Sequence, residues 1–169
     1  KLFMPSIEPL AEGASAPTFD FVSKEGVSGN TQELAGKAFL IYFYPKDDTP
    51  GCTKEACAFR DAYEDFRLVD VPIIGVSGDS QSSHDKFRKK FQLPFPLASD
   101  SSKFEIAKAF GVYGEKKFMG KVYEGIHRVS FLIGPNGDIL KTYRKVKPDL
   151  HAQEVLMDIK ELNSTQSHV

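Results

Sequence analysis

The sequence contains no tryptophan and only two cysteines, Cys52 and Cys57, in 169 residues. A secreted domain held together by disulfides would contain more cysteines and would join distant segments, whereas these two are separated by four residues. Two cysteines also exclude a four-cysteine zinc site or a common iron–sulfur cluster within one chain. The local chemistry of the segment that contains both cysteines is therefore the question to pursue.

The two signs of charge nearly balance, with 22 basic and 23 acidic residues and a formal net charge of -1. No apolar run approaches the ~18 residues that a membrane span needs. We therefore expect neither nucleic acid nor a membrane as a partner. Residues 1–10 show no secretory signal. The expected location is the cytoplasm, or an organelle reached with a targeting peptide that has been removed.

The composition, with 41% hydrophobic and 27% charged residues, is typical of a globular protein. A continuous apolar run over residues 38–44, ended by Pro45, predicts a strand buried on both faces. Periodicity and turn residues predict further strands over 71–77, 127–133 and 139–143, and helices over about 50–66, 82–91, 102–110 and 149–162. This order predicts an α/β, thioredoxin-like fold, with a central mixed β-sheet flanked by helices on both faces.

We expect one thioredoxin-like domain over residues 1–169. Residues 1–7 form an extension and residues 163–169 a polar tail, and both are expected to be loosely ordered. Residues 30–34 predict a short helical turn. Residues 95–98 are predicted to be extended only at an edge or in a loop, because Pro94 and Pro96 cannot donate ladder hydrogen bonds.

Cys52 falls in the first turn of the helix predicted after the buried strand. Thr49 is the expected N-cap, and Pro50 suits the first helical position. Free backbone N–H groups and the positive end of the helix dipole favour an anion there, and the thiolate is the reactive form of cysteine. A cysteine can equally be a small, inert core residue. Position alone leaves both interpretations open.

Residues 45–57, PKDDTPGCTKEAC, resemble the peroxidatic loop of peroxiredoxins. The signature of that loop is a proline, three residues, a threonine, two residues and a cysteine, which Pro45, Thr49 and Cys52 satisfy. The TPGCTxEAC form is similar to the bacterioferritin-comigratory-protein or peroxiredoxin Q subfamily, as are residues 113–120 and 125–133. The resemblance covers roughly residues 8–163.

This resemblance implies a thioredoxin-dependent peroxidase that reduces hydrogen peroxide and organic hydroperoxides, needs no cofactor or metal, and is a monomer. Cys52 would be the peroxidatic nucleophile, and Thr49 and Arg128 would bind both sulfur and peroxide. Gly51 would leave room for the peroxide beside backbone N–H groups. The resemblance further implies that Pro45 shields the sulfur from water, and Glu55 would support the loop. His127, although adjacent to the arginine, is assigned no catalytic role.

Ionisation alone cannot account for catalysis by such a thiol. Complete ionisation at pH 7 raises the thiolate fraction of an ordinary thiol only ~30-fold, or about 2 kcal/mol. Enzymes commonly need ~10⁶-fold or more. The site must therefore also hold the peroxide in line with the sulfur and stabilise the charge on the departing oxygen.

Cys57 is expected to be the resolving cysteine. On an intact helix the two cysteine Cα atoms would be about 8–9 Å apart, beyond the ~7 Å that a disulfide spans. We therefore expect that Cys52 becomes a sulfenic acid, the first turns unwind, and Cys57 attacks it with loss of water. Thioredoxin or a similar dithiol would then reduce the disulfide. The alternative is a Cys57 that stays on the helix while Cys52 reacts with an outside thiol.

Three other functions compete with this interpretation. A thioredoxin-like disulfide reductase would need the tighter Cys-x-x-Cys spacing, which lets both sulfurs meet without unwinding. A redox sensor or a holdase that binds a partner protein stays open as an additional activity; a sensor would react with peroxide once, whereas a peroxidase cycles with a reductant. A metal site on Asp47, Asp48 and a histidine has little support, because adjacent loop carboxylates are expected to face solvent.

Overall fold

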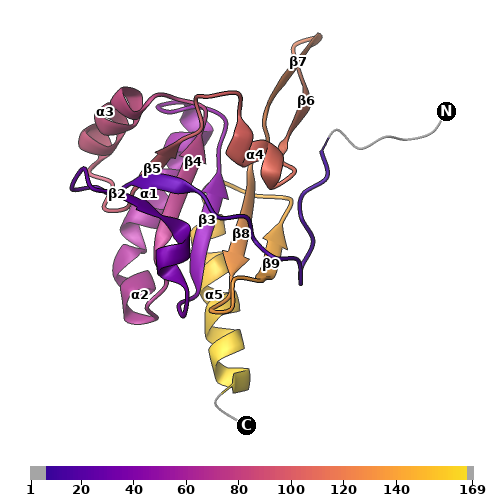
Figure 1. The fold of residues 1–169 in the computed structure, drawn as a ribbon. Helices are drawn as coiled ribbons and strands as arrows, with labels where there is room; N and C mark the ends of the chain where they lie inside the picture. The colour runs from indigo at the N-terminus through magenta and orange to yellow at the C-terminus, as the bar shows by residue number, and fades with distance from the viewer. Residues whose placement is uncertain (1–6, 167–169) are drawn as a thin grey trace, which may run out of the picture.

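The computed structural model describes residues 7–166 and is built around a five-stranded mixed sheet (Figure 1). The strand order is β5-β4-β3-β8-β9. β3 pairs in parallel with β4 and β4 with β5, whereas β8 runs antiparallel to both β3 and β9. The strands are β3 (Phe39–Phe43), β4 (Ile73–Ser77), β5 (Leu97–Ser99), β8 (Val129–Ile133) and β9 (Ile139–Tyr143).

Both faces of this sheet are covered, because alternate residues of a strand point to opposite sides. Leu40, Tyr42 and Tyr44 belong to a core cluster with α1, α2, α3 and α5, whereas Phe39, Ile41 and Phe43 pack with α4 and the N-terminal segment. The predicted α/β, thioredoxin-like arrangement is thus confirmed. The helices are α1 (Pro50–Asp61), α2 (Tyr63–Leu68), α3 (Gln81–Phe91), α4 (Glu105–Ala109) and α5 (His151–Gln166).

Several helix boundaries differ from the prediction. The helix predicted over residues 50–66 is divided at Ala62 into α1 and α2, although Ala62 N still bonds Ala58 O. The helix predicted over 102–110 is shortened to α4, because Lys103 and Phe104 have positive φ angles that no helix accepts. The polar segment from 163 was expected to be frayed, but α5 continues to Gln166; residues 167–169 lie outside the described part.

The sequence interpretation missed two hairpins. β1 (Asp20–Val22) pairs with β2 (Ser28–Asn30), and β6 (Tyr113–Phe118) pairs with β7 (Lys121–Ile126) in a hairpin that projects from the body (Figure 1). Most side chains of β6 and β7 are at least partly exposed, so no apolar alternation marks these strands. The predicted helical turn is confirmed as η1 (Thr31–Leu34). Between residues 7 and 166, no helix is long and apolar enough to cross a membrane.

Candidate active site

The amino end of α1 follows the carboxyl end of β3 after a short loop. Thr49 is the N-cap residue and Pro50 opens the helix, as predicted. The first helical hydrogen bond runs from Thr53 N to Thr49 O at 2.8 Å. The N–H groups of Gly51 and Cys52 therefore make no hydrogen bond within the helix and lie at the positive end of the helix dipole. Cys52 lies in this first turn, where an anion is stabilised.

Arg128 reaches the sulfur from a different strand. Its Nη2 donates to Cys52 Sγ at 3.4 Å, and its Nη1 donates to Glu55 Oε1 at 2.8 Å. The register explains this meeting, because Val129 at the start of β8 pairs with Phe43 at the end of β3. Cys52 is only 1% exposed and Glu55 is 0% exposed. One guanidinium fork thus joins a buried carboxyl group and a buried sulfur.

Glu55 is an unusual carboxyl group. Burial raises its pKa from the ordinary 4.5 to about 7, although the charge and the hydrogen bond of Arg128 oppose that rise. Within the described residues its second oxygen, Oε2, has no hydrogen-bond partner, and the same holds for the buried hydroxyl of Tyr42. Burial lowers the pKa of Arg128, but Glu55 and Cys52 raise it by more, so its net shift is upward. Arg128 therefore stays cationic beside the sulfur.

The remaining predicted residues surround the same turn. Thr49 Oγ1 donates to Lys46 O at 2.9 Å instead of capping a helix amide, so its lone pairs can accept a hydrogen bond from another group. Gly51 allows Arg128 to approach, because a Cβ added there would lie 3.1 Å from Arg128 Nη2. Pro45 is half-buried between β3 and the loop and offers no N–H.

Cys57 lies on the same unbroken helix as Cys52, and both thiols are free. Cys57 is partly exposed, whereas Cys52 is buried. A continuous helix between them keeps the sulfurs apart for the geometric reason given above. A disulfide between them therefore requires the first turns of α1 to unwind.

The two loop aspartates have different surroundings. Asp48 is exposed and its Oδ2 pairs with Lys90 Nζ at 2.8 Å. The expectation that both would face solvent is wrong for Asp47, which is 7% exposed. Its carboxylate contacts three side chains that the sequence interpretation did not bring together with it: Tyr44, Ser83 and His84. No local sequence signal marks these contacts, because Asp47 lies in a loop and two of the three residues lie far along the chain on α3.

His127 is turned toward the β6–β7 hairpin, where its Nε2 lies 2.9 Å from Glu115 O. It was assigned no catalytic role, and this contact gives it a structural one. In the part of the chain that the structure describes, no group of three or more histidine, cysteine or acidic side chains could hold a metal ion.

Comparison with known proteins places this site in a family. Residues 13–142 match the AhpC/TSA family. The chain is 45% identical over 151 residues to "Peroxiredoxin Bcp" of Bacillus subtilis, covering 89% of this chain and 96% of that protein. It is 37% identical over 148 residues to "Peroxiredoxin Q, chloroplastic" of Sedum lineare, covering 87% and 76%.

A solved structure shows the same fold. The bacterioferritin comigratory protein of Xanthomonas campestris, studied for its alkyl peroxide reduction activity, superposes with a TM-score of 0.80. It is 36% identical, and the match covers 91% of this chain and 98% of that one. Both the family match and these relatives extend over the segment with Cys52, Glu55 and Arg128. The chain therefore belongs to the AhpC/TSA family of peroxiredoxins, in its bacterioferritin-comigratory-protein and peroxiredoxin Q branch.

Proposed function

We propose that this chain is a thiol-dependent peroxidase in which Cys52 reduces hydrogen peroxide and organic hydroperoxides. The supporting observation is the 3.4 Å contact from the Arg128 guanidinium to the Cys52 sulfur at the amino end of α1. A permanent cation and a helix dipole converge there on one buried sulfur. Because Cys52 is only 1% exposed, a hydroperoxide must present its terminal O–OH end first. Its organic part can then remain outside.

In the first step the Cys52 thiolate attacks the terminal oxygen of the hydroperoxide. A sulfur–oxygen bond forms, the oxygen–oxygen bond breaks, and the other oxygen leaves as an alcohol or water once it is protonated. Sulfur is oxidised by two electrons and the peroxide is reduced by two. We assign the N–H groups of Gly51 and Cys52, together with Arg128, to holding the peroxide oxygens. The Thr49 hydroxyl oxygen would accept a hydrogen bond from the peroxide O–H, and Pro45 would keep water from the sulfur.

In the second step we propose that Cys57 attacks the sulfenic acid and expels water, which leaves a disulfide between Cys52 and Cys57. Unwinding of α1 would move both Cys52 and Glu55 away from the Arg128 guanidinium, which now contacts both. A dithiol donor such as thioredoxin would then restore both thiols. Recycling by a dithiol donor needs a reducing compartment, so we expect the protein in the cytoplasm or in an organelle. From its resemblance to the subfamily we also expect a monomer.

Peroxide turnover with thioredoxin and its reductase tests the proposal on the unaltered chain, Cys52→Ser and Cys57→Ser. We expect no turnover from Cys52→Ser. Cys57→Ser should consume one equivalent of peroxide and then stall, or depend on an added thiol. Mass spectrometry after one equivalent should show the unaltered peptide with both cysteines two hydrogens lighter. A stable sulfenic acid or an intermolecular dimer in the unaltered chain would contradict the intramolecular route.

The same preparation separates the competing functions. A disulfide reductase would reduce insulin and would not consume peroxide. A redox sensor would react once and would not cycle with the reductant. Continuous peroxide consumption without insulin reduction is the result that we expect.

A further inference from the structure

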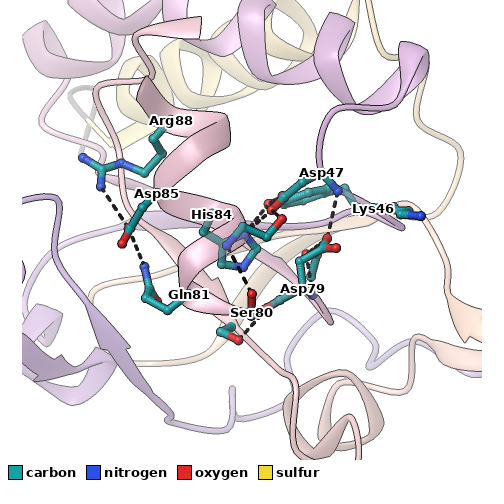
Figure 2. Close-up of polar contacts among 12 residues, drawn as sticks. Lys46, Asp47, Asp79, Ser80, Gln81, His84, Asp85 and Arg88 are labelled. Atoms are coloured by element: carbon teal, nitrogen blue, oxygen red, sulfur yellow. Dashed lines mark hydrogen bonds and ion pairs between the residues drawn. The ribbon is translucent and has the colours of Figure 1, made fainter. Parts of the chain in front are cut away.

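Asp47 is anchored through its side chain to α3. Its Oδ1 accepts a hydrogen bond from the Tyr44 hydroxyl at 2.6 Å, and its Oδ2 accepts one from Ser83 Oγ at 2.8 Å. Oδ2 also lies 2.8 Å from Nδ1 of His84, which is 0% exposed (Figure 2). Figure 2 shows the Asp47 carboxylate pointing into α3 from the loop. The carboxylate therefore meets three donors away from water.

The other ring nitrogen of His84 is also engaged. Nε2 lies 3.0 Å from Ala98 O in β5. Each ring nitrogen thus lies within hydrogen-bond distance of an oxygen. Because the imidazole is completely buried, an unpaired nitrogen would have no water to turn to. His84 consequently links the loop to β5 as well as to α3.

The backbone of Asp47 is held from a second direction. Its N–H donates to Asp79 Oδ2 at 2.8 Å (Figure 2). The same oxygen accepts a bond from Ser77 Oγ at 2.7 Å. Asp79 follows β4, so the anchor of Asp47 rests on the end of β4 as well. The next residue, Asp48, is exposed and has a φ of 55°, so the chain turns sharply between the anchored Asp47 and Thr49.

We propose that Asp47 and His84 are positioning residues, which fix the loop before α1 so that Thr49 and the amino end of α1 meet the peroxide correctly. This inference rests on the function proposed above. The two chemical steps make opposite demands on this region. Peroxide attack needs a fixed turn, whereas disulfide formation needs the first turns of α1 to unwind. The anchor ends at Asp47, which precedes the segment that must unwind. Weakening the anchor should therefore slow the first step and not the second.

Tyr44→Phe tests this with minimal change of shape, because it removes only the hydroxyl that bonds Asp47 Oδ1. Tyr143→Phe is the matched control: Tyr143 is also buried, and its hydroxyl donates to Asp158 Oδ2 at 2.7 Å between β9 and α5. The first rate is measured by competition with another peroxidase for hydrogen peroxide. The second is measured by quenching with an alkylating reagent after one equivalent of peroxide and weighing the peptide that contains both cysteines.

We expect Tyr44→Phe to lower the first rate about tenfold, as small misplacements of catalytic groups do. It should leave the rate of disulfide formation within about twofold of the unaltered chain or raise it. Tyr143→Phe should leave both rates within about twofold. Among His84 variants of equal melting temperature, His84→Asn keeps a donor for Asp47 and should retain more of the first rate than His84→Leu.

Equal rates for Tyr44→Phe and Tyr143→Phe would overturn the inference, and so would a Tyr44→Phe chain in which both steps slow alike. The outcome for the proposed function is read separately. If the unaltered chain failed to oxidise Cys52 with peroxide at all, the proposed function would fail before the anchor was tested.

Discussion

Arg128 contacts both the reacting sulfur and a buried carboxyl group, so a double substitution can separate these two contacts. Arg128→Met removes the guanidinium and keeps a side chain of similar length. It leaves Glu55, which is 0% exposed, without the 2.8 Å ion pair that now compensates its burial. Glu55→Gln in the same chain removes the stranded charge. The two chains therefore differ in stability but share the loss of the donor to Cys52.

The expected magnitudes follow from this geometry. Removing one partner of a buried ion pair typically costs about 3–5 kcal/mol. Glu55, with a pKa of about 7, can bind a proton instead at a cost of about 1.4 kcal/mol at pH 8. Arg128→Met should therefore lose about 1–2 kcal/mol of unfolding free energy at pH 8. The loss should shrink at pH 5.5, because Glu55 can then be protonated. The double variant should recover most of it at pH 8. Removing one donor from a developing anion costs about 100-fold in rate, and neither chain should recover that factor.

Two measurements decide the outcome. Urea unfolding is followed by far-ultraviolet circular dichroism, since the chain has no tryptophan. The second-order rate with hydrogen peroxide is measured by competition on folded protein. If the double variant regained the peroxide rate together with its stability, Arg128 would act only by holding Glu55 and the catalytic assignment would be wrong. A single variant within about threefold of the unaltered rate would refute the reasoning as directly.

Three further predictions concern single residues. Burial raises the folded pKa of Glu55 from 4.5 to about 7, so its contribution to stability is present below about pH 4.5 and disappears as the pH rises through about 7. Glu55→Gln should therefore flatten the pH dependence of the unfolding free energy, measured with urea between pH 5 and 8. The same pH dependence in the variant and the unaltered chain would contradict the assignment. Gly51→Ala should leave stability unchanged or raise it by up to about 1 kcal/mol. It should lower the peroxide rate, because the new Cβ would lie 3.1 Å from Arg128 Nη2. An unchanged rate would show that the Arg128 guanidinium can move aside without loss of function. Gly111→Ala should destabilise the fold by more than about 2 kcal/mol, since its φ is +75° and a Cβ would lie 1.9 Å from Glu8 O. The peroxide rate of the molecules that remain folded should change little. A melting temperature equal to that of the unaltered chain would disprove this packing.

Local features were predictable because neighbouring residues along the chain determine them. The apolar run of β3, the proline that follows it and the cap at Thr49 predicted a helix that begins just before Cys52, and the structure confirms that placement. Helix periodicity also showed why Cys57 cannot reach the first sulfur without unwinding. These predictions depend on side-chain period, capping and backbone geometry, all of which act over a few residues.

Long-range features depended on how the strands pair. Arg128 is 76 residues from Cys52, and its guanidinium reaches the sulfur because β8 pairs antiparallel with β3 in one particular register. Residue type suggested solvent for Asp47, but folding buries it against a histidine 37 residues away. Burial also raises the pKa of Glu55, which its position in a helical turn does not reveal. Contacts between distant segments and the loss of water around them arise when the sheet and helices pack, and no short stretch of sequence encodes them.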